Sequence, residues 1–366
     1  MAAADLSNAD SDVFIYTEGV EVPRDISHAR IHPSVTIIPE KAFSDCRKLV
    51  EVELCDGLLE VGMEAFKNCK QLKKISIPPT VTKIGDRAFW ECNQVEEVEL
   101  CEGLQEIGEY AFYCCKPLYH IAIPSTVVQI HGGAFCHTPL LNLNLPDGIQ
   151  SIGHSAYCHN QFTNFRVPPL ISTIPDSQFC YCDNVFSVEL PESIVSISGE
   201  MAFHDCYSLR NIAIPMGADV IQSESRHSMG KTFGECVYPG RTDLNQVLGP
   251  DDGPIINALK HRFENLPIHK IIYYQSYNDV SADQLISVLD DSGKEQDCLG
   301  MTPLHILACS TVQNFKLYQV LVTNYPESLL TEDKWGAIPL LYAIWGNTPD
   351  EIVKFLAESY QSMHPK

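Results

Sequence analysis

The hydrophobic positions in the N-terminal part of the chain recur with a fixed period. An aromatic residue, usually followed three positions later by a small one, returns in steps of 23, 23, 23, 23, 22, 22 and 24 residues, at Phe43, Phe66, Phe89, Phe112, Phe135, Tyr157, Phe179 and Phe203. A repeat of this length is typical of solenoids, in which each unit buries its apolar residues only against its neighbours. A degenerate ninth unit ends at Cys236 after a short insertion.

Between the aromatic residues, apolar and polar residues alternate over a few positions, as in Ile75 and Ile77 around Ser76. A period of two predicts a short strand with one buried face. A further apolar residue and a glycine, such as Ile84 and Gly85, predict a tight bend in each coil. Because neighbouring strands lie about 4.8 Å apart, we expect the stacked coils to form a continuous parallel sheet along one side.

The recurring unit reads L-x-x-I-x-I-P-x-x-V-x-x-I-G-x-x-A-F-x-x-C, and it resembles the BspA-like (treponemal-type) leucine-rich repeat family. The resemblance covers residues 24–236, about nine coils of 22–24 residues. It implies an α/β leucine-rich repeat solenoid. Residues 1–23 are predicted to form an N-terminal tail and a capping strand within "DVFIYTEGVEVP".

The C-terminal part of the chain has a different rhythm. Pro267, Pro303 and Pro339 are spaced 36 residues apart, and Asp-x-x-Gly turns precede the second and third of them. In "TPLH", Thr302 is predicted to cap a helix that begins at Pro303. These motifs resemble a short ankyrin array, although the family period is 33 residues. We therefore expect a linker at residues 237–258 and an all-α array of three ankyrin-like repeats at 259–366.

Seven of the fifteen cysteines fall into one column of the repeat. Three residues after each aromatic residue stand Cys46, Cys69, Cys92, Cys115, Thr138, Asn160, Cys182 and Cys206, and Cys236 follows in the ninth unit. Cys, Thr and Asn share a small size and a hydrogen-bond donor, which predicts a buried structural ladder that satisfies loop carbonyls. Disulfides along the column are the alternative, since the coil spacing falls within the Cα window of a disulfide.

Two further cysteine positions offer other chemistry. Cys136–His137 and Cys158–His159 stand one above the other in adjacent coils, the one place where a zinc site can be imagined. The usual C-x-x-C spacing is missing, so we predict no metal and no other cofactor. Cys114 occupies a slot that other coils fill with polar residues, and it is the cysteine we expect to react if any does.

The total charge narrows the classes of partner. The net charge is −22, which argues against nucleic-acid binding, because a phosphate backbone selects basic faces. The chain has neither an N-terminal secretory pattern nor an apolar run long enough to span a membrane. Fifteen cysteines, an odd number, then favour free thiols in a reducing compartment. We expect a cytoplasmic monomer with no membrane association.

No nucleophile–base pair, phosphate-binding loop or spaced carboxylate pair stands out, so no catalytic residue is predicted. Solenoids usually bind partners on their concave face, where the strand residues that point outward lie. The first coils carry charged residues there and the later ones neutral residues, which predicts a protein-binding patch at Tyr119, His120, Leu141, Asn142, Arg166 and Phe186. The resulting interpretation is a non-catalytic interaction scaffold; the alternatives are a surface adhesin or matrix-binding protein, and a thiol redox or zinc-binding protein.

Overall fold

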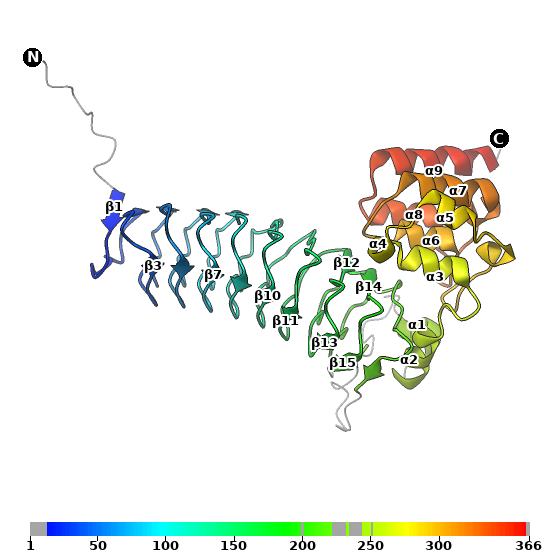
Figure 1. Cartoon of the computed structure of the whole chain (residues 1–366), viewed down its shortest axis with the longest axis horizontal. Helices are drawn as coiled ribbons and strands as arrows, with labels where there is room; N and C mark the ends of the chain where they lie inside the picture. The colour runs from blue at the N-terminus through cyan, green and yellow to red at the C-terminus, as the bar shows by residue number, and fades with distance from the viewer. Residues whose placement is uncertain (1–12, 199–200, 222–231, 234–243, 250–251, 364–366) are drawn as a thin grey trace, which may run out of the picture. The chain divides into compact units, whose positions relative to one another are not determined.

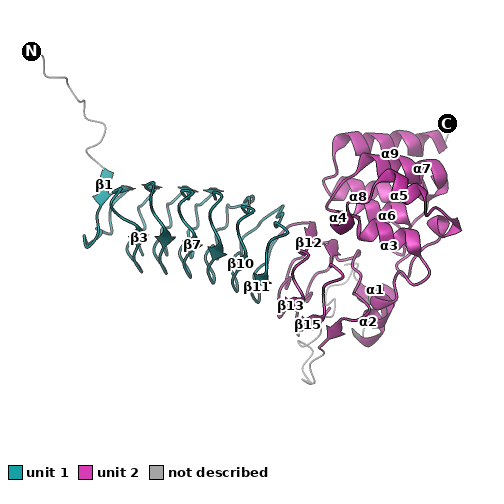
Figure 2. Cartoon of the chain, in the orientation of Figure 1, with its two compact units in different colours: residues 1–160 teal, residues 161–366 magenta. Residues whose placement is uncertain are grey.

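The computed structural model describes residues 13–198, 201–221, 232–233, 244–249 and 252–363. The chain forms two compact units, residues 1–160 and residues 161–366 (Figure 2). The predicted tail before residue 13, Cys236, and residues 237–243 and 250–251 of the predicted linker lie outside the described residues. The division at residue 160 falls inside the predicted solenoid, because the later coils pack against the helices that follow them.

The first unit is a stack of coils with two parallel ladders (Figure 1). Each coil pairs with the next in a register of one repeat, so that Glu51 lies beside Lys74 and Lys74 beside Glu97. One ladder, in the order β1-β2-β4-β6-β8, comprises β1 (Val13–Tyr16), β2 (His28–Ile31), β4 (Glu51–Glu53), β6 (Lys74–Ser76) and β8 (Glu97–Glu99). The fold is thus the parallel solenoid that the repeat predicts.

The second ladder corresponds to the predicted bends. It consists of β3 (Ile37–Ile38), β5 (Glu60–Val61), β7 (Lys83–Ile84), β9 (Glu106–Ile107), β10 (Gln129–Ile130) and β11 (Ser151–Ile152). Two residues are too few to display a period of two, so the sequence pattern did not reveal these strands. In the first ladder the sheet is less continuous than expected. After β8, the pairing described in the first unit is an isolated bridge between His120 and Asn142.

Stacked aromatic rings fill the centre of the coils. In the first unit Phe43, Phe66, Phe89, Phe112 and Phe135 are fully buried, and successive ring centroids lie 5.0–5.6 Å apart. In the second unit Phe179, Phe203 and Phe233 stack at 5.3 and 5.5 Å. These distances follow the rise of one strand spacing per coil, so each coil buries its ring only between two neighbours.

The second unit contains the later coils and a helical region. Its strands are β12 (Asn164–Arg166) paired with β14 (Ser187–Glu189), and β13 (Thr173–Pro175), β15 (Ser196–Ser198) and β16 (Asp219–Val220) in a second ladder. The helices are α1 (Leu244–Leu248), α2 (Asp252–Lys260), α3 (Pro267–Tyr273), α4 (Gln275–Asn278), α5 (Ala282–Ile286), η1 (Asp291–Lys294), α6 (Pro303–Ala308), α7 (Phe315–Asn324), η2 (Pro326–Leu329), α8 (Pro339–Trp345) and α9 (Asp350–Met363). Helices α1 and α2 begin inside the stretch predicted as a linker.

Three proline-led helices, α3, α6 and α8, start at the predicted residues, and Thr302 is the N-cap of α6. The aspartate of the first Asp-x-x-Gly turn stabilises the turn itself: Asp297 Oδ1 accepts the N–H groups of Leu299 and Met301, at 2.8 and 2.9 Å. Gly300 ends that turn with φ at 78°, a left-handed conformation that favours glycine. No helix in the described ranges combines the length and the apolar character needed to cross a bilayer.

Candidate protein-interaction surface

Four residues of the predicted patch lie in two adjacent coils of the first unit. His120 and Asn142 form a parallel bridge, and the Leu141 N–H donates to the Tyr119 carbonyl at 2.9 Å. Tyr119 exposes 48% of its surface and Leu141 exposes 40%. His120 and Asn142 are exposed as well. The two coils therefore present an aromatic ring and an aliphatic chain beside neutral polar groups.

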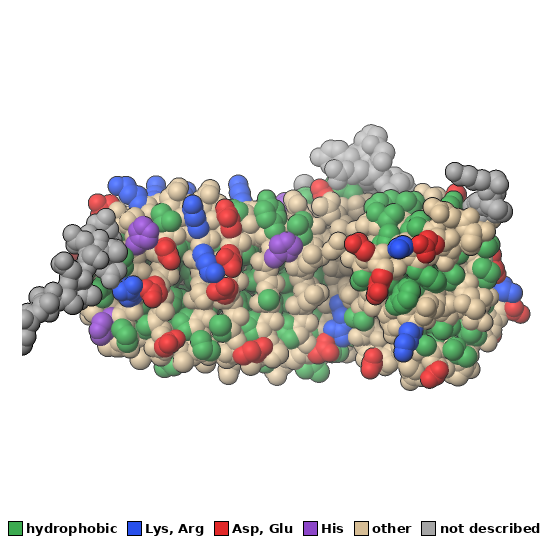
Figure 3. All heavy atoms as spheres, turned by 90° about the horizontal axis from the view of Figure 1, so that it is seen from above, with side chains coloured by type: hydrophobic (Ala, Val, Ile, Leu, Met, Phe, Trp, Pro, Cys, Tyr) green, Lys and Arg blue, Asp and Glu red, His purple; other side chains and the backbone are tan. Residues whose placement is uncertain are grey.

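The preceding coils carry charges that pair across the sheet. Lys74 Nζ of β6 lies 3.2 Å from a carboxylate oxygen of Glu97 and 3.0 Å from one of Glu99, both on β8. Arg30 of β2 pairs with Glu53 of β4. Figure 3 shows acidic and basic side chains lying next to each other on this face. Because water screens exposed pairs, they stabilise the fold little, but they leave this part of the surface polar.

The other two patch residues, Arg166 and Phe186, contact the helical region of the second unit. Phe186 is only 5% exposed, and its ring centroid lies 5.8 Å from that of Tyr342 on α8. The expected exposure of Phe186 is therefore wrong. Arg166 Nη2 donates to the Ser276 carbonyl at 3.1 Å, and its guanidinium lies 4.3 Å from the Tyr277 ring centroid. The helices already occupy this part of the face.

Two tyrosine hydroxyls of the helices bond to the backbone of the coils. The Tyr273 hydroxyl of α3 accepts the N–H groups of Leu190 and Ala213, at 3.2 and 3.1 Å, and donates to the Val188 carbonyl at 2.9 Å. The Tyr277 hydroxyl of α4 lies 2.9 Å from the Val167 carbonyl oxygen and 2.7 Å from that of Glu189. The Tyr273 hydroxyl thus supplies an acceptor to two backbone N–H groups of the coils, and the Tyr277 hydroxyl adds a donor to two backbone carbonyls.

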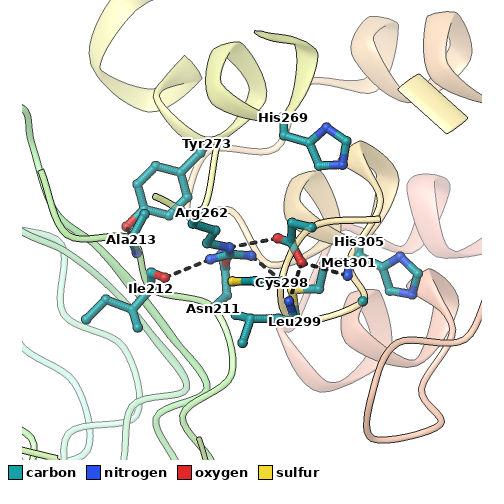
Figure 4. Close-up of polar contacts among 12 residues, drawn as sticks. Asn211, Ile212, Ala213, Arg262, His269, Tyr273, Cys298, Leu299, Met301 and His305 are labelled. Carbon is teal, nitrogen blue, oxygen red and sulfur yellow. Dashed lines mark hydrogen bonds and ion pairs between the residues drawn. The ribbon is translucent and has the colours of Figure 1, made fainter. Parts of the chain in front are cut away.

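A buried guanidinium joins the last coil to the helical region (Figure 4). Arg262 Nη1 donates to Asn211 Oδ1 at 2.7 Å and to the Ile212 carbonyl at 2.9 Å. Its Nε donates at 2.7 Å to Asp297 Oδ2, whose other oxygen holds the Asp-x-x-Gly turn. Both side chains of the ion pair are fully buried. Removing either partner would leave an uncompensated charge, which is strongly destabilising.

A second buried charge lies on β14. Glu189 is 1% exposed, and its carboxylate accepts the Ser276 hydroxyl at 2.5 Å, the Thr311 N–H at 2.7 Å and the Thr311 hydroxyl at 3.1 Å. Burial raises the pKa of this carboxyl, against the opposing effect of the hydrogen bonds. In the register of the sheet, Glu189 lies beside Arg166.

The cysteine column lies in the interior, where its side chains donate to carbonyls one coil away. The Sγ atoms of Cys69 and Cys92 each lie 3.2 Å from the carbonyl oxygens of Phe43 and Phe66. The substitutes make the equivalent bond, from Thr138 Oγ1 to Phe112 at 2.6 Å and from Asn160 Nδ2 to Phe135 at 2.9 Å. Cys46, Cys115, Cys182 and Cys206 are buried in the same column. The described cysteines are free thiols.

Cys114 and its equivalents adopt a left-handed backbone. The φ angle of Cys114 is 59°, and Asp45, Asn68, Glu91, His137, His159, Tyr181 and Asp205 in the same slot have φ angles of 55–60°. Polar residues such as Asn, Asp and His tolerate this conformation best. Cys114 is partly exposed, and burial raises its pKa, which makes the thiol less reactive.

The second cysteine column and its histidines do not converge on a metal site. The rings of His137 and His159 stack with centroids 3.9 Å apart, and Cys136 and Cys158 are buried. Burial, and then the neighbouring His159, lowers the pKa of His137. Within the residues that the structure describes, no group of three or more His, Cys, Asp or Glu side chains is arranged to hold a metal ion.

The sequence pattern did not identify the residues that join coils and helices: Glu189, Arg262, Tyr273 and Tyr277. Glu189 stands at an outward strand position where two earlier coils carry the exposed glutamates Glu53 and Glu99, so its burial has no local signal. The tyrosines belong to "IIYYQSYND", whose three tyrosines within five residues were the only indication.

Known leucine-rich repeat structures resemble this chain at low identity. A T. pallidum leucine-rich repeat protein is 23% identical over 55% of this chain and 85% of its own, with a TM-score of 0.36. A leucine-rich cell surface protein from Faecalibacterium prausnitzii A2-165 is 21% identical over 61% and 85%, with a TM-score of 0.36. A leucine-rich repeat protein from Bacteroides ovatus ATCC 8483 is 20% identical over 58% and 78%, with a TM-score of 0.35.

No curated protein matches the chain. In contrast, the family described as "BspA type Leucine rich repeat region" matches residues 23–139 and 105–231. The two matches overlap, and together they cover more than half of the chain. They span the coils of both units and end before the helical region. The protein therefore belongs to the BspA-type leucine-rich repeat family.

Proposed function

We propose that this protein is a non-catalytic interaction scaffold that binds a protein partner through Tyr119, His120, Leu141 and Asn142. The observation that carries the proposal is the exposure of Tyr119 and Leu141 next to each other on the sheet face. An aromatic ring beside an aliphatic chain, both exposed, has the composition of an interface centre. The leucine-rich repeat fold supports a binding role in general, since solenoids offer extended surfaces to partners.

The test is a quantitative affinity capture with the full chain. Tyr119→Ala/Leu141→Ala removes the apolar groups, and Ile37→Ala/Leu59→Ala serves as the control, since Ile37 and Leu59 are 50% and 49% exposed at the second ladder of the same unit. We expect bound proteins to be depleted at least tenfold by the first pair and unchanged by the second. An identical set of bound proteins with the wild type and Tyr119→Ala/Leu141→Ala would contradict the proposal.

We further propose a cytoplasmic location, a monomeric state and an ankyrin-like arrangement of the helical region. Free thiols buried in the cysteine column support a reducing compartment. The evenly spaced helices α3, α6 and α8, each led by proline, support the ankyrin-like repeat. Fractionation of cells that express the endogenous protein tests the location, and recovery outside the cell would favour the adhesin alternative.

A further inference from the structure

The outward sheet face of the second unit's coils is covered at β14. On β8 the two outward residues, Glu97 and Glu99, are exposed on either side of a buried valine. On β14 the equivalent residues, Ser187 and Glu189, are 0% and 1% exposed. The same strand pattern therefore has one face open in the first unit and both faces buried in the second. The side chains that bury β14 come from α3, α4 and the segment after α6.

This contact has the polar character of a docked surface. The hydroxyl groups of Tyr273 and Tyr277 bond to backbone atoms of the coils, and Phe186 contacts Tyr342. The hydroxyl and amide groups that bond to Glu189 from Ser276 and Thr311 are neutral. A carboxylate taken from water into such a site loses hydration that neutral donors only partly replace.

We infer that the helical region is a reversible cover on the sheet face of the second unit's coils, and that its docking removes Ser187 and Glu189 from water. Undocking would return Glu189 to water, where its negative charge is stable, and would uncover Phe186 and Ser187 for a protein partner. The cover thus regulates access to part of the solenoid face. This inference concerns the second unit alone and does not depend on the patch at Tyr119 and Leu141.

The sign of the pH effect follows from the direction of the shift. The docked state raises the pKa of Glu189 above the ordinary carboxyl value of 4.5. The protonated form is therefore favoured by docking, and the full stabilisation is present below 4.5. It is lost as the pH rises from 4.5 through the docked pKa, by about tenfold in the docking constant for each pH unit within that window.

Other polar and titratable side chains lie around Glu189. Arg166 of β12 contributes a guanidinium beside it in the register of the sheet. Burial raises the pKa of Tyr273 on α3 to about 12, and it also raises the pKa of Tyr277 on α4 and of Cys309 after α6. These three groups therefore stay neutral at the pH values at which carboxyl groups ionise, and Glu189 is the carboxyl in this cluster whose raised pKa couples its ionisation to docking.

One buried histidine acts in the opposite direction. Burial lowers the pKa of His269 on α3 to about 4, so His269 favours the folded state at higher pH and loses this contribution as the pH falls from 6.5 to 4. Its Nε2 contacts the Glu295 carbonyl within the helical region. The ionisation of His269 is therefore coupled to unfolding of the helical region, whereas the ionisation of Glu189 is coupled to undocking. The variant Glu189→Gln separates the two effects.

The experiment is hydrogen–deuterium exchange at single-residue resolution on the full chain at pH 5, 6, 7 and 8, corrected for intrinsic rates. The amides of Leu190 and Ala213 donate to the Tyr273 hydroxyl, so their protection reports docking. The amide of Val188 donates to the Asn211 carbonyl within the coils and is the reference. We expect protection of Leu190 relative to Val188 to fall by about tenfold per pH unit above 4.5 until the docked pKa is passed.

Glu189→Gln, which resembles the protonated acid in shape and charge, should show high protection of Leu190 with no such fall. Glu192→Gln is the matched control, because exposed Glu192 pairs with Lys270 at the same interface, at 2.8 Å; it should titrate like the wild type. The inference is overturned if wild-type protection of Leu190 does not fall with pH, or if Glu189→Gln keeps the wild-type fall. The wild-type titration decides alone if Glu189→Gln does not fold.

Discussion

Removal of the Tyr273 hydroxyl tests whether the helices supply hydrogen bonds that the coils lack. Tyr273 is 1% exposed, and Tyr273→Phe keeps its ring while deleting one oxygen. The N–H groups of Leu190 and Ala213 would then have no acceptor, since the Tyr273 hydroxyl is the partner that each has among the described residues. Each unsatisfied buried donor costs about 1–3 kcal/mol. Allowing for partial relaxation, we expect Tyr273→Phe to destabilise the second unit by about 2–4 kcal/mol.

Tyr277→Phe is the matched control in the same interface. The Tyr277 hydroxyl bonds to two carbonyl oxygens, and one of them, that of Glu189, also accepts the Val167 N–H at 3.0 Å. A carbonyl that keeps one partner loses less than an N–H that loses its only one. We therefore expect a cost of about 1 kcal/mol for Tyr277→Phe.

The assay is urea denaturation followed by tryptophan fluorescence, because Trp335 and Trp345 both lie in the second unit. Far-ultraviolet circular dichroism follows the whole chain in parallel, so that the transition of the second unit can be recognised. The reasoning would be refuted if Tyr273→Phe were no more destabilising than Tyr277→Phe. A loss below about 0.5 kcal/mol for Tyr273→Phe would refute it equally, because it would mean that the two amides find other partners.

Two further predictions concern the coils. Cys92→Thr should be nearly neutral, since Thr138 already fills the column. Cys92→Val should cost about 0.5–1 kcal/mol, because the Phe66 carbonyl loses the thiol donor and keeps only the Cys69 N–H. Thermal denaturation compares the two variants, and equal melting temperatures would contradict the ladder. Gly57 and Gly103 occupy equivalent turns, with φ at 97° and 121°. A Cβ added at Gly103 would lie 2.2 Å from the Pro79 carbonyl oxygen, whereas a Cβ added at Gly57 would meet no atom within 4 Å. Gly103→Ala should therefore lower the melting temperature clearly more than Gly57→Ala, and a similar effect of both would show that backbone strain alone decides.

The repeat in the sequence determined the contacts within each coil and the contacts between equivalent positions of neighbouring coils. Phe43 predicts where Phe66 lies, because a step of one repeat in sequence is a step of one strand spacing in space. For the same reason the occurrence of Thr138 and Asn160 in the cysteine column indicated a hydrogen-bond donor at that position, and the prolines at residues 303 and 339 indicated where two helices begin.

The tertiary structure alone decided which part of the face is open. Glu99 and Glu189 both end an outward-facing strand motif, yet one is exposed and the other is buried under helices that lie far along the chain. A local pattern records which side of a strand points inward, but it contains no information on a non-repeated segment that packs on the opposite side. The contacts through which Glu189, Arg262 and Tyr273 join the coils to the helical region link residues 50 or more positions apart that share no period, so only the folded chain brings them together.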